Sequence, residues 1–377
     1  MSHAEREAML LVAATAMACA VPGVFLVLRR LALIGDAMGH VLLFGIVGMY
    51  YLTGDLDSPW LTAGAVLSGV LTVALVEALQ RTQLLREDAA IGLVFPALFS
   101  VGTLIASLHF RDTHLDVDQV LLGHVEYASR APMLTLFGTP VGRQPTVIMG
   151  GLVVFNVLLA ALFFKELKLT TFDAALAATL GFLPTLVHYS LMTVVSLTTV
   201  AAFDAVGPVL VVAFLVLPAL AARLLTERLA WVIALSLAFA LVGAVLGVRA
   251  AFALSTNTAG MTAVVLGLLY GATLLVAPRR GLVAEAVQRF RRRREFFETM
   301  LTIHLAQHEG TAAEADEADE VGLHRHLHWQ TRDVGAVVRR ALARGLVVRG
   351  GATLRLTEAG RARARHAFGD LAVQRAQ

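Results

Sequence analysis

The sequence predicts an all-α polytopic membrane protein of about eight or nine transmembrane helices, followed by a small α+β domain. Hydrophobic residues make up 57% of the 377 residues and charged residues only 16%, and the mean hydropathy is +0.73. The apolar residues gather in runs of about 20, the length that crosses a bilayer as a helix. Charged residues concentrate in the last quarter of the chain, which predicts a membrane part over 1–281 and a soluble part after it.

Nine apolar segments are long enough to span the membrane. Basic residues lie at the end of every second segment, so they all fall on one side if every segment spans. The positive-inside rule makes that side cytoplasmic, with the N-terminus outside and the C-terminus inside. The first segment is the one most open to lying partly in the interface. The segments are 8–28, 31–53, 59–79, 89–108, 146–164, 182–203, 206–225, 229–252 and 257–278.

Asp36 and His40 lie four residues apart inside the second segment, so a helix presents them on one face. Ionisable groups at membrane depth usually face a polar pathway or a partner rather than lipid. One carboxylate and one imidazole suit manganese, iron(II) or zinc better than magnesium or copper(I). Two ligands are too few for a closed site, and a dimer would supply four. The alternative is a structural pair, with Asp36 bonded to a neighbouring helix.

His188, about four residues into the sixth segment, is a further candidate for a pathway, or else a satisfied core histidine. The sequence contains no phosphate-binding G-x-x-x-x-G-K-[ST] loop and no nucleophile elbow or H-E-x-x-H pattern. We therefore expect no enzymatic activity of the chain itself. Active transport would need an ATP-hydrolysing partner or an ion gradient.

The predicted cytoplasmic loop after the fifth segment contains a short helix, Phe172 to Leu180, which Gly181 ends. Thr171 or Asp173 is the expected N-cap. A loop helix with an apolar face needs a surface that buries that face. Either it lies on the membrane interface or it docks on a cytoplasmic motor protein, and the periodicity alone does not separate these alternatives.

Several segments, in order and in register over residues 5–281, resemble the permease subunits of metal-ion ABC importers of the manganese, zinc and iron branch. The run around Asp36 and His40 is similar to the family's second-span motif. One departure stands at Phe44, where family members commonly carry proline. The similar segments are RRLALIGDAMGHVLLFG, REDAAIGLVFPALFSVGTLIAS, HLDVDQVLLGHV, KELKLTTFDAALAATLGF, LVHYSLM, FDAVGPVLVVAFLVLPALAARLLTERL and APRRG.

The resemblance implies a permease with the cobalamin-type importer fold in a bacterial cytoplasmic membrane, with lipid around it. It implies a second permease subunit (identical or not), cytoplasmic ATP-binding subunits, and an extracytoplasmic metal-binding protein. It implies no permanently bound cofactor, only the transported divalent metal. Asp36 and His40 match the translocation route. The loop helix, about 170–181, looks like the ATPase-coupling helix, with Phe172, Asp173, Ala177 and Gly181 in matching positions.

After residue 281 we expect a basic linker helix over 282–295 and a winged-helix domain over 296–377. Two helical patterns, two strands about Gly350-Gly351 and a last helix from Glu358 resemble the DNA-binding domains of metal-dependent repressors, notably in the run L-T-E-A-G-R. Tethering to a membrane and the acidic insertion EADEADE argue against DNA as a partner. Packing against the ATPases or a second copy is the expectation.

The run HRHLHW places His324, His326 and His328 at alternate positions, which share one face of a strand. They form a candidate regulatory metal site, and the alternative is a flexible His-rich loop. The repressor-like tail favours manganese as the substrate, with zinc or iron(II) as alternatives. Two other classes stay open: a secondary cation transporter, and a membrane-tethered metal-responsive regulator.

Overall fold

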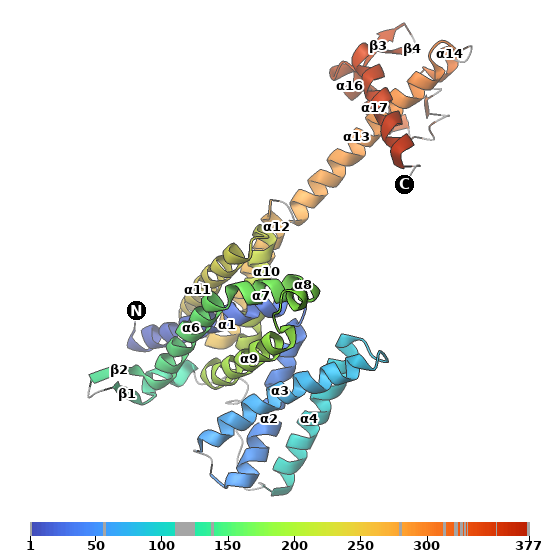
Figure 1. Cartoon of the computed structure of the whole chain (residues 1–377). Coiled ribbons are helices and arrows are strands. Elements are labelled where there is room, and N and C mark those ends of the chain that lie inside the picture. The colour runs from blue at the N-terminus through green and yellow to red at the C-terminus, as the bar shows by residue number, and fades with distance from the viewer. Residues whose placement is uncertain are drawn as a thin grey trace. The chain divides into compact units, whose positions relative to one another are not determined.

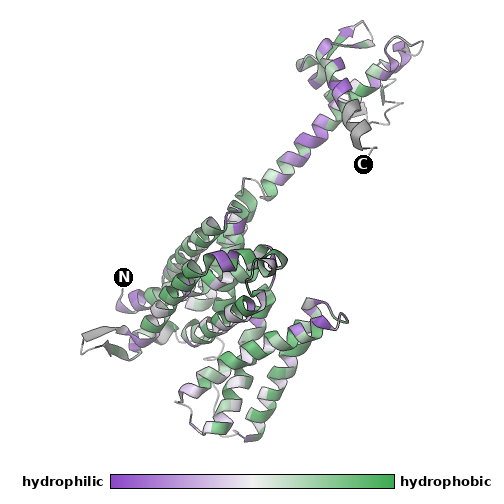
Figure 2. Cartoon of the chain, viewed as in Figure 1, coloured by the Kyte–Doolittle hydropathy of each residue, from purple (hydrophilic) through white to green (hydrophobic). Residues whose placement is uncertain are grey.

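The computed structural model describes residues 2–55, 58–109, 125–136, 139–278, 281–311, 314–319, 323–324, 327, 329, 331–351 and 353–374. The chain forms two compact units, Met1–Gly281 and Leu282–Gln377. Within the described residues, the first unit has nine helices that are long and apolar enough to cross a membrane, as the sequence predicts. They make up most of the helical ribbon from α1 to α12 (Figure 1), and their residues are mainly hydrophobic (Figure 2).

These nine helices begin and end close to the predicted apolar segments. Serine, asparagine or proline residues stand at several of their N-terminal ends, where caps and fixed φ angles favour helix initiation. The bounds are α1 His3–Leu28, α2 Ala32–Thr53, α3 Pro59–Arg81, α4 Glu87–His109, α6 Gln144–Leu162, α9 Pro184–Val206, α10 Pro208–Leu225, α11 Leu229–Leu254 and α12 Thr258–Val276.

Helix α1 is the central helix of the first unit. In its most apolar window 83% of the residues are buried, and α6, α9, α10 and α11 pack around it. Its N-terminus carries a capping box in which Ser2 and Glu5 each bind the other's backbone N–H. This enclosure supports α1 as a spanning helix, and a position partly in the interface stays an alternative prediction.

Helices α2, α3 and α4 pack through glycines. A Cβ at Gly45 of α2 would strike the carbonyl of Gly64 on α3, and a Cβ at Gly102 of α4 would lie 2.9 Å from the backbone of Phe44. Small residues let helices approach closely in a membrane. Helix α2, with Phe44 in its interior, runs unbroken from Ala32 to Thr53.

The connection between α4 and α6 contains an element that the sequence did not predict. The 3₁₀ helix η1 (Val125–Arg130) leads to an antiparallel hairpin of β1 (Met133–Leu136) and β2 (Thr139–Arg143). The much shorter turn between α9 and α10 is the single residue Gly207, whose φ of +81° favours glycine.

The second unit has its own hydrophobic core, built by one long helix, one shorter helix, a hairpin and two residues of the segment between the helices, Ala318 and Leu323. The long helix α13 (Leu282–His308) combines the predicted linker with the predicted first helix of the domain, so no helix boundary falls at residue 295. The hairpin and the last two helices lie where the sequence predicts them. The remaining elements are α14 Glu314–Glu317, α16 Thr331–Ala343, β3 Val347–Gly350, β4 Thr353–Leu356 and α17 Glu358–Gln374.

Candidate functional site

Asp36 and His40 lie together on one face of α2, as their spacing predicts. The Nε2 of His40 is 3.9 Å from Oδ1 of Asp36, and the two side chains are 48% and 51% exposed. They therefore face away from the core of their own unit. Exposed ionisable groups on a membrane helix need a polar pathway or a partner beside them.

The surroundings of His40 come from α4. Its ring centroid lies 5.6 Å from that of Phe95 and 6.2 Å from that of Phe99. Beside this pair on α2, the ring of Phe203 from α9 packs against Gly39 and leaves no room for a Cβ. These contacts hold α2 between α4 and α9, so the rotation of the Asp36–His40 face is fixed by packing.

Arg29, the C-cap of α1, joins three parts of the first unit. Its guanidinium donates to the hydroxyls of Thr170 at 2.9 Å and Thr171 at 3.2 Å. The same group lies 3.2 Å from Nδ1 of His188 on α9. A guanidinium presents several donors in a rigid plane, which suits one side chain that must hold several acceptors.

His188 in turn contacts α3. Because Arg29 has only donors, Nδ1 of His188 accepts, and the ring proton sits on Nε2. That Nε2 lies 2.8 Å from Oε1 of Glu77, and Tyr189 donates to the other oxygen of Glu77 at 2.7 Å. The structure thus places His188 inside a polar cluster with Arg29, Glu77, Thr170 and Tyr189, and does not bring it to Asp36 and His40.

The predicted loop helix is divided in two by Asp173. Helix α7 (Phe164–Phe172) continues from α6, and α8 (Ala174–Thr179) starts after Asp173, so the helix begins two residues later than predicted. The carboxylate of Asp173 accepts from the N–H of Leu176 at 2.8 Å, as one of the two expected caps. Gly181 ends the segment with φ of +86°.

An apolar surface of α7 and α8 is exposed in this structure. Phe172, Leu176 and Leu180 are 60%, 46% and 60% exposed, whereas Ala177 is fully buried against the unit. Thr170 and Thr171, which accept hydrogen bonds from Arg29, come directly before this surface in the sequence. The surface is therefore tied to the end of α1 by the guanidinium of Arg29.

In the tail, His324 is an exposed residue of a short helical stretch, while His326 and His328 lie outside the described residues. The structure therefore leaves the three-histidine site as a prediction. It brings together a different group, His304, His308 and Glu317, one ligand atom from each within 4.8 Å of the others.

Sequence reasoning missed Arg29, Glu77 and Tyr189. Glu77 had a signal, since it is an acid inside the third apolar segment. Arg29 was read only as an orientation marker. Their meeting depends on four helices converging at one end of the unit, which spacing along the chain does not encode.

The fold and the site together define a polytopic helical membrane protein with an acid–imidazole pair on one helix and an exposed apolar loop helix. The sequence profile described as the ABC 3 transport family matches residues 3–277, and the chain belongs to that family.

Two curated relatives and one solved structure extend this assignment. The zinc transport system membrane protein TroD of Treponema pallidum is 41% identical over 354 residues, 94% of this chain and 96% of TroD. The manganese transport system membrane protein MntD of Bacillus subtilis is 37% identical over 74% of this chain and 94% of MntD. The structure titled PsaBC from Streptococcus pneumoniae in complex with Fab has a TM-score of 0.61 at 25% identity, covering 74% of this chain and 94% of that chain.

The lengths of these matches bear on the tail. The TroD match spans 354 residues, more than the first unit contains, so it extends well into the second unit. MntD is matched over 94% of its length by only 74% of this chain. The second unit is therefore shared with TroD, whereas the first unit suffices for nearly the whole MntD match.

Proposed function

We propose that this chain is the membrane permease of an ATP-driven importer for a divalent first-row transition metal. The observation that carries the proposal is the exposed Asp36–His40 pair on α2. A carboxylate oxygen and an imidazole nitrogen are donors for manganese, iron(II) and zinc. The names of the relatives, zinc transport for TroD and manganese transport for MntD, support the same class of ion.

The donor set supports a site shared between two chains. One chain supplies two ligands on an exposed face, and a metal ion needs four or more. A second permease subunit facing α2 would supply the rest and would cover two side chains that lipid does not solvate. In this assembly the ion passes between two copies of α2, and closing that interface at one end or the other gives alternating access.

Energy would enter through α7 and α8. We propose that Phe172, Leu176 and Leu180 dock on a cytoplasmic ATP-binding subunit, since an exposed apolar surface on a short loop helix needs a partner. The cluster around Arg29 supports this assignment because it links the loop to α1 and α3. The loop would then lie on the cytoplasmic side, with the N-terminus outside.

The sequence favours manganese on the strength of the repressor-like tail. The relative that shares the tail is named for zinc, so the tail alone does not favour manganese over zinc. The winged-helix assignment of the tail and its packing against the ATPases or a second copy are also proposals. An extracytoplasmic metal-binding protein would deliver the ion.

The test is uptake by the reconstituted complex in sealed vesicles. Radiolabelled manganese should enter only with ATP on the loop side, and unlabelled zinc, manganese and iron(II) compete in the order of their affinities. Uptake that follows a proton gradient and ignores ATP would assign the chain to a secondary transporter and overturn the proposal.

A further inference from the structure

The second unit contains a cluster of three possible metal-binding side chains that no sequence motif predicts. His304 and His308 are one turn apart on α13, and their ring centroids are 4.9 Å apart. Glu317, at the end of α14, brings Oε2 to 3.2 Å from Nε2 of His304. The chain reverses after His308, and this reversal makes α14 face the last turn of α13.

We propose that His304, His308 and Glu317 bind a divalent transition-metal ion, with zinc as the best fit. Two imidazoles and one carboxylate with an open fourth position form a donor set that zinc commonly takes. Zinc bonds of about 2.0–2.1 Å place tetrahedral ligands about 3.3 Å apart. The separation of His304 and Glu317 already matches this value.

The remaining ligand needs only a small adjustment. All three ligand atoms lie within 4.8 Å of one another, so closing the triangle requires shifts on the order of 1 Å, which side-chain torsions supply. His304 is 9% exposed, and Glu317 has a side chain that is 14% exposed. A structural pair of His304 and Glu317 would not require a second imidazole. The ring of His308 beside this pair supplies the third ligand of a metal-binding set.

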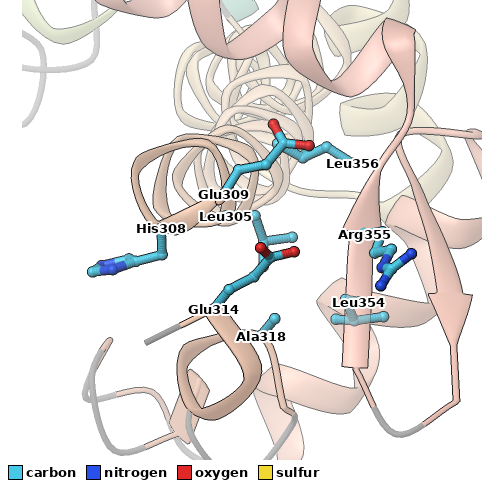
Figure 3. Close-up of a pocket in the computed structure, with 8 residues that line it drawn as sticks. All are labelled: Leu305, His308, Glu309, Glu314, Ala318, Leu354, Arg355 and Leu356. Carbon is cyan, nitrogen blue, oxygen red and sulfur yellow. The ribbon is translucent and has the colours of Figure 1, made fainter. Parts of the chain in front are cut away.

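The nearby charges favour a cation. Glu309 and Glu314 line an adjacent pocket together with His308. In Figure 3 the ring of His308 points away from Arg355, which lies across the pocket. The imidazole of His308 is therefore turned away from that guanidinium, and the carboxylate of Glu317 gives the cluster a negative charge that attracts a cation.

Metal binding at this site would stabilise the position of the β3–β4 hairpin relative to α13. The residue after Glu317 is Ala318, whose carbonyl accepts from the N–H of Leu354 at 3.0 Å, and Asp319 pairs with Thr353 on β4. An ion on Glu317 thus joins α13 to the β3–β4 hairpin. In an importer of the same ions, this site would report the internal metal level; that role rests on the proposed function, whereas the binding does not.

The experiment titrates zinc into the full-length chain in detergent by calorimetry. An Asp36→Ala/His40→Ala background removes binding in the membrane unit. We expect one ion per chain, and at least a tenfold loss of affinity in His308→Gln and in Glu317→Gln, because even partners of ligands contribute about 10–100-fold. His366→Gln, an exposed histidine of α17, is the matched control and should bind normally.

Unchanged zinc affinity in both His308→Gln and Glu317→Gln would overturn the site. If His324→Gln lost zinc binding while His308→Gln kept it, the proposed site would also be overturned. The ion would then be assigned to the run 324–328. Thermal melts of each variant without metal show whether the unit is folded. Because glutamine has nearly the shape of glutamate, Glu317→Gln should change the packing of the unit very little. Uptake is not measured, so a failed titration leaves the importer proposal intact.

Discussion

The Nη2 of Arg29 donates a hydrogen bond to the hydroxyl of Thr170 across 2.9 Å and so joins the end of α1 to the helix before α8. The same guanidinium reaches His188, which lies 2.8 Å from Glu77. Three transmembrane helices and the loop therefore meet at one side chain. Movement of the loop is expected to reach α2 through this group, because α2 starts three residues after Arg29.

Replacing Arg29 by alanine should separate ATP hydrolysis from uptake. Hydrogen bonds to a charged group contribute about 1.5–3 kcal/mol each, so the loop loses a strong attachment to the membrane helices. We expect uptake to fall at least tenfold while the ATPase still co-purifies. Arg29→Lys should recover only part of the lost uptake, since one ammonium group cannot reach all the acceptors that the guanidinium binds. Normal uptake in Arg29→Ala would contradict the transmission role.

Asp36→Ala and His40→Ala should each abolish metal uptake while the complex still assembles. Both side chains are about half exposed, so removing them leaves the core of the unit unchanged. The measurement is vesicle uptake together with size-exclusion chromatography of the complex. The pathway assignment fails if both variants transport at the normal rate.

Asp173→Ala should loosen α8, because the carboxylate of Asp173 caps the N–H of Leu176. Loss of an N-cap destabilises a helix by about 1 kcal/mol, which is about a fivefold change in the equilibrium constant between ordered and disordered loop. Uptake should fall by up to this factor. Asp173→Asn is the matched control, since asparagine also caps; an equal loss in Asp173→Asn would assign the effect to the charge instead.

Glu298→Ala should strongly destabilise the second unit. Glu298 is fully buried, and Arg344 and Arg340 lie 2.8 and 3.5 Å from its two oxygens. Breaking a fully buried ion pair costs about 3–5 kcal/mol, and the cost here is smaller because Arg340 and Arg344 are 34% and 52% exposed. Limited proteolysis of the full chain should then cleave after residue 282 first. Glu295→Ala, which removes only a partly exposed side chain of α13, should leave the cleavage pattern unchanged.

The second unit should also lose stability in acid through Glu309. The Arg361 guanidinium donates to its carboxylate and holds the pKa of Glu309 below its ordinary value of 4.5. A depressed pKa means that the stabilisation is fully present above this value and is lost as the pH falls through the folded pKa. Melting temperatures recorded between pH 6 and 3 should show this loss, and Arg361→Ala should flatten it. The effect is small because both groups are partly exposed.

Most of the helical architecture was predictable because hydrophobic runs and caps are local. The nine spans, the cap at Asp173, the left-handed Gly181 and the hairpin around Gly350 follow from residues near each other in sequence. The Asp36–His40 pair was predictable for the same reason, since helix geometry alone brings the two together.

The rest depends on tertiary packing. His188 was a candidate for the pathway and stays one, but its contacts with Arg29 and Glu77, which arrive from other helices, could not be predicted. The helix α7 before Asp173 was not predicted, although the cap that starts α8 was. The His304–His308–Glu317 group depends on a chain reversal, and neither spacing nor composition indicates where α14 returns.

The enclosure of α1 has a consequence for biosynthesis. Helix α1 precedes along the chain the helices that surround it, so it leaves the translocon before they exist. Its surface must therefore be compatible with lipid at first, and later it must pack against other helices on nearly every side. A mean hydropathy of 2.3 serves the first stage. Its many alanines and Gly23, which touches the backbone of Leu215, serve the second, because later helices close over it without displacing bulky side chains.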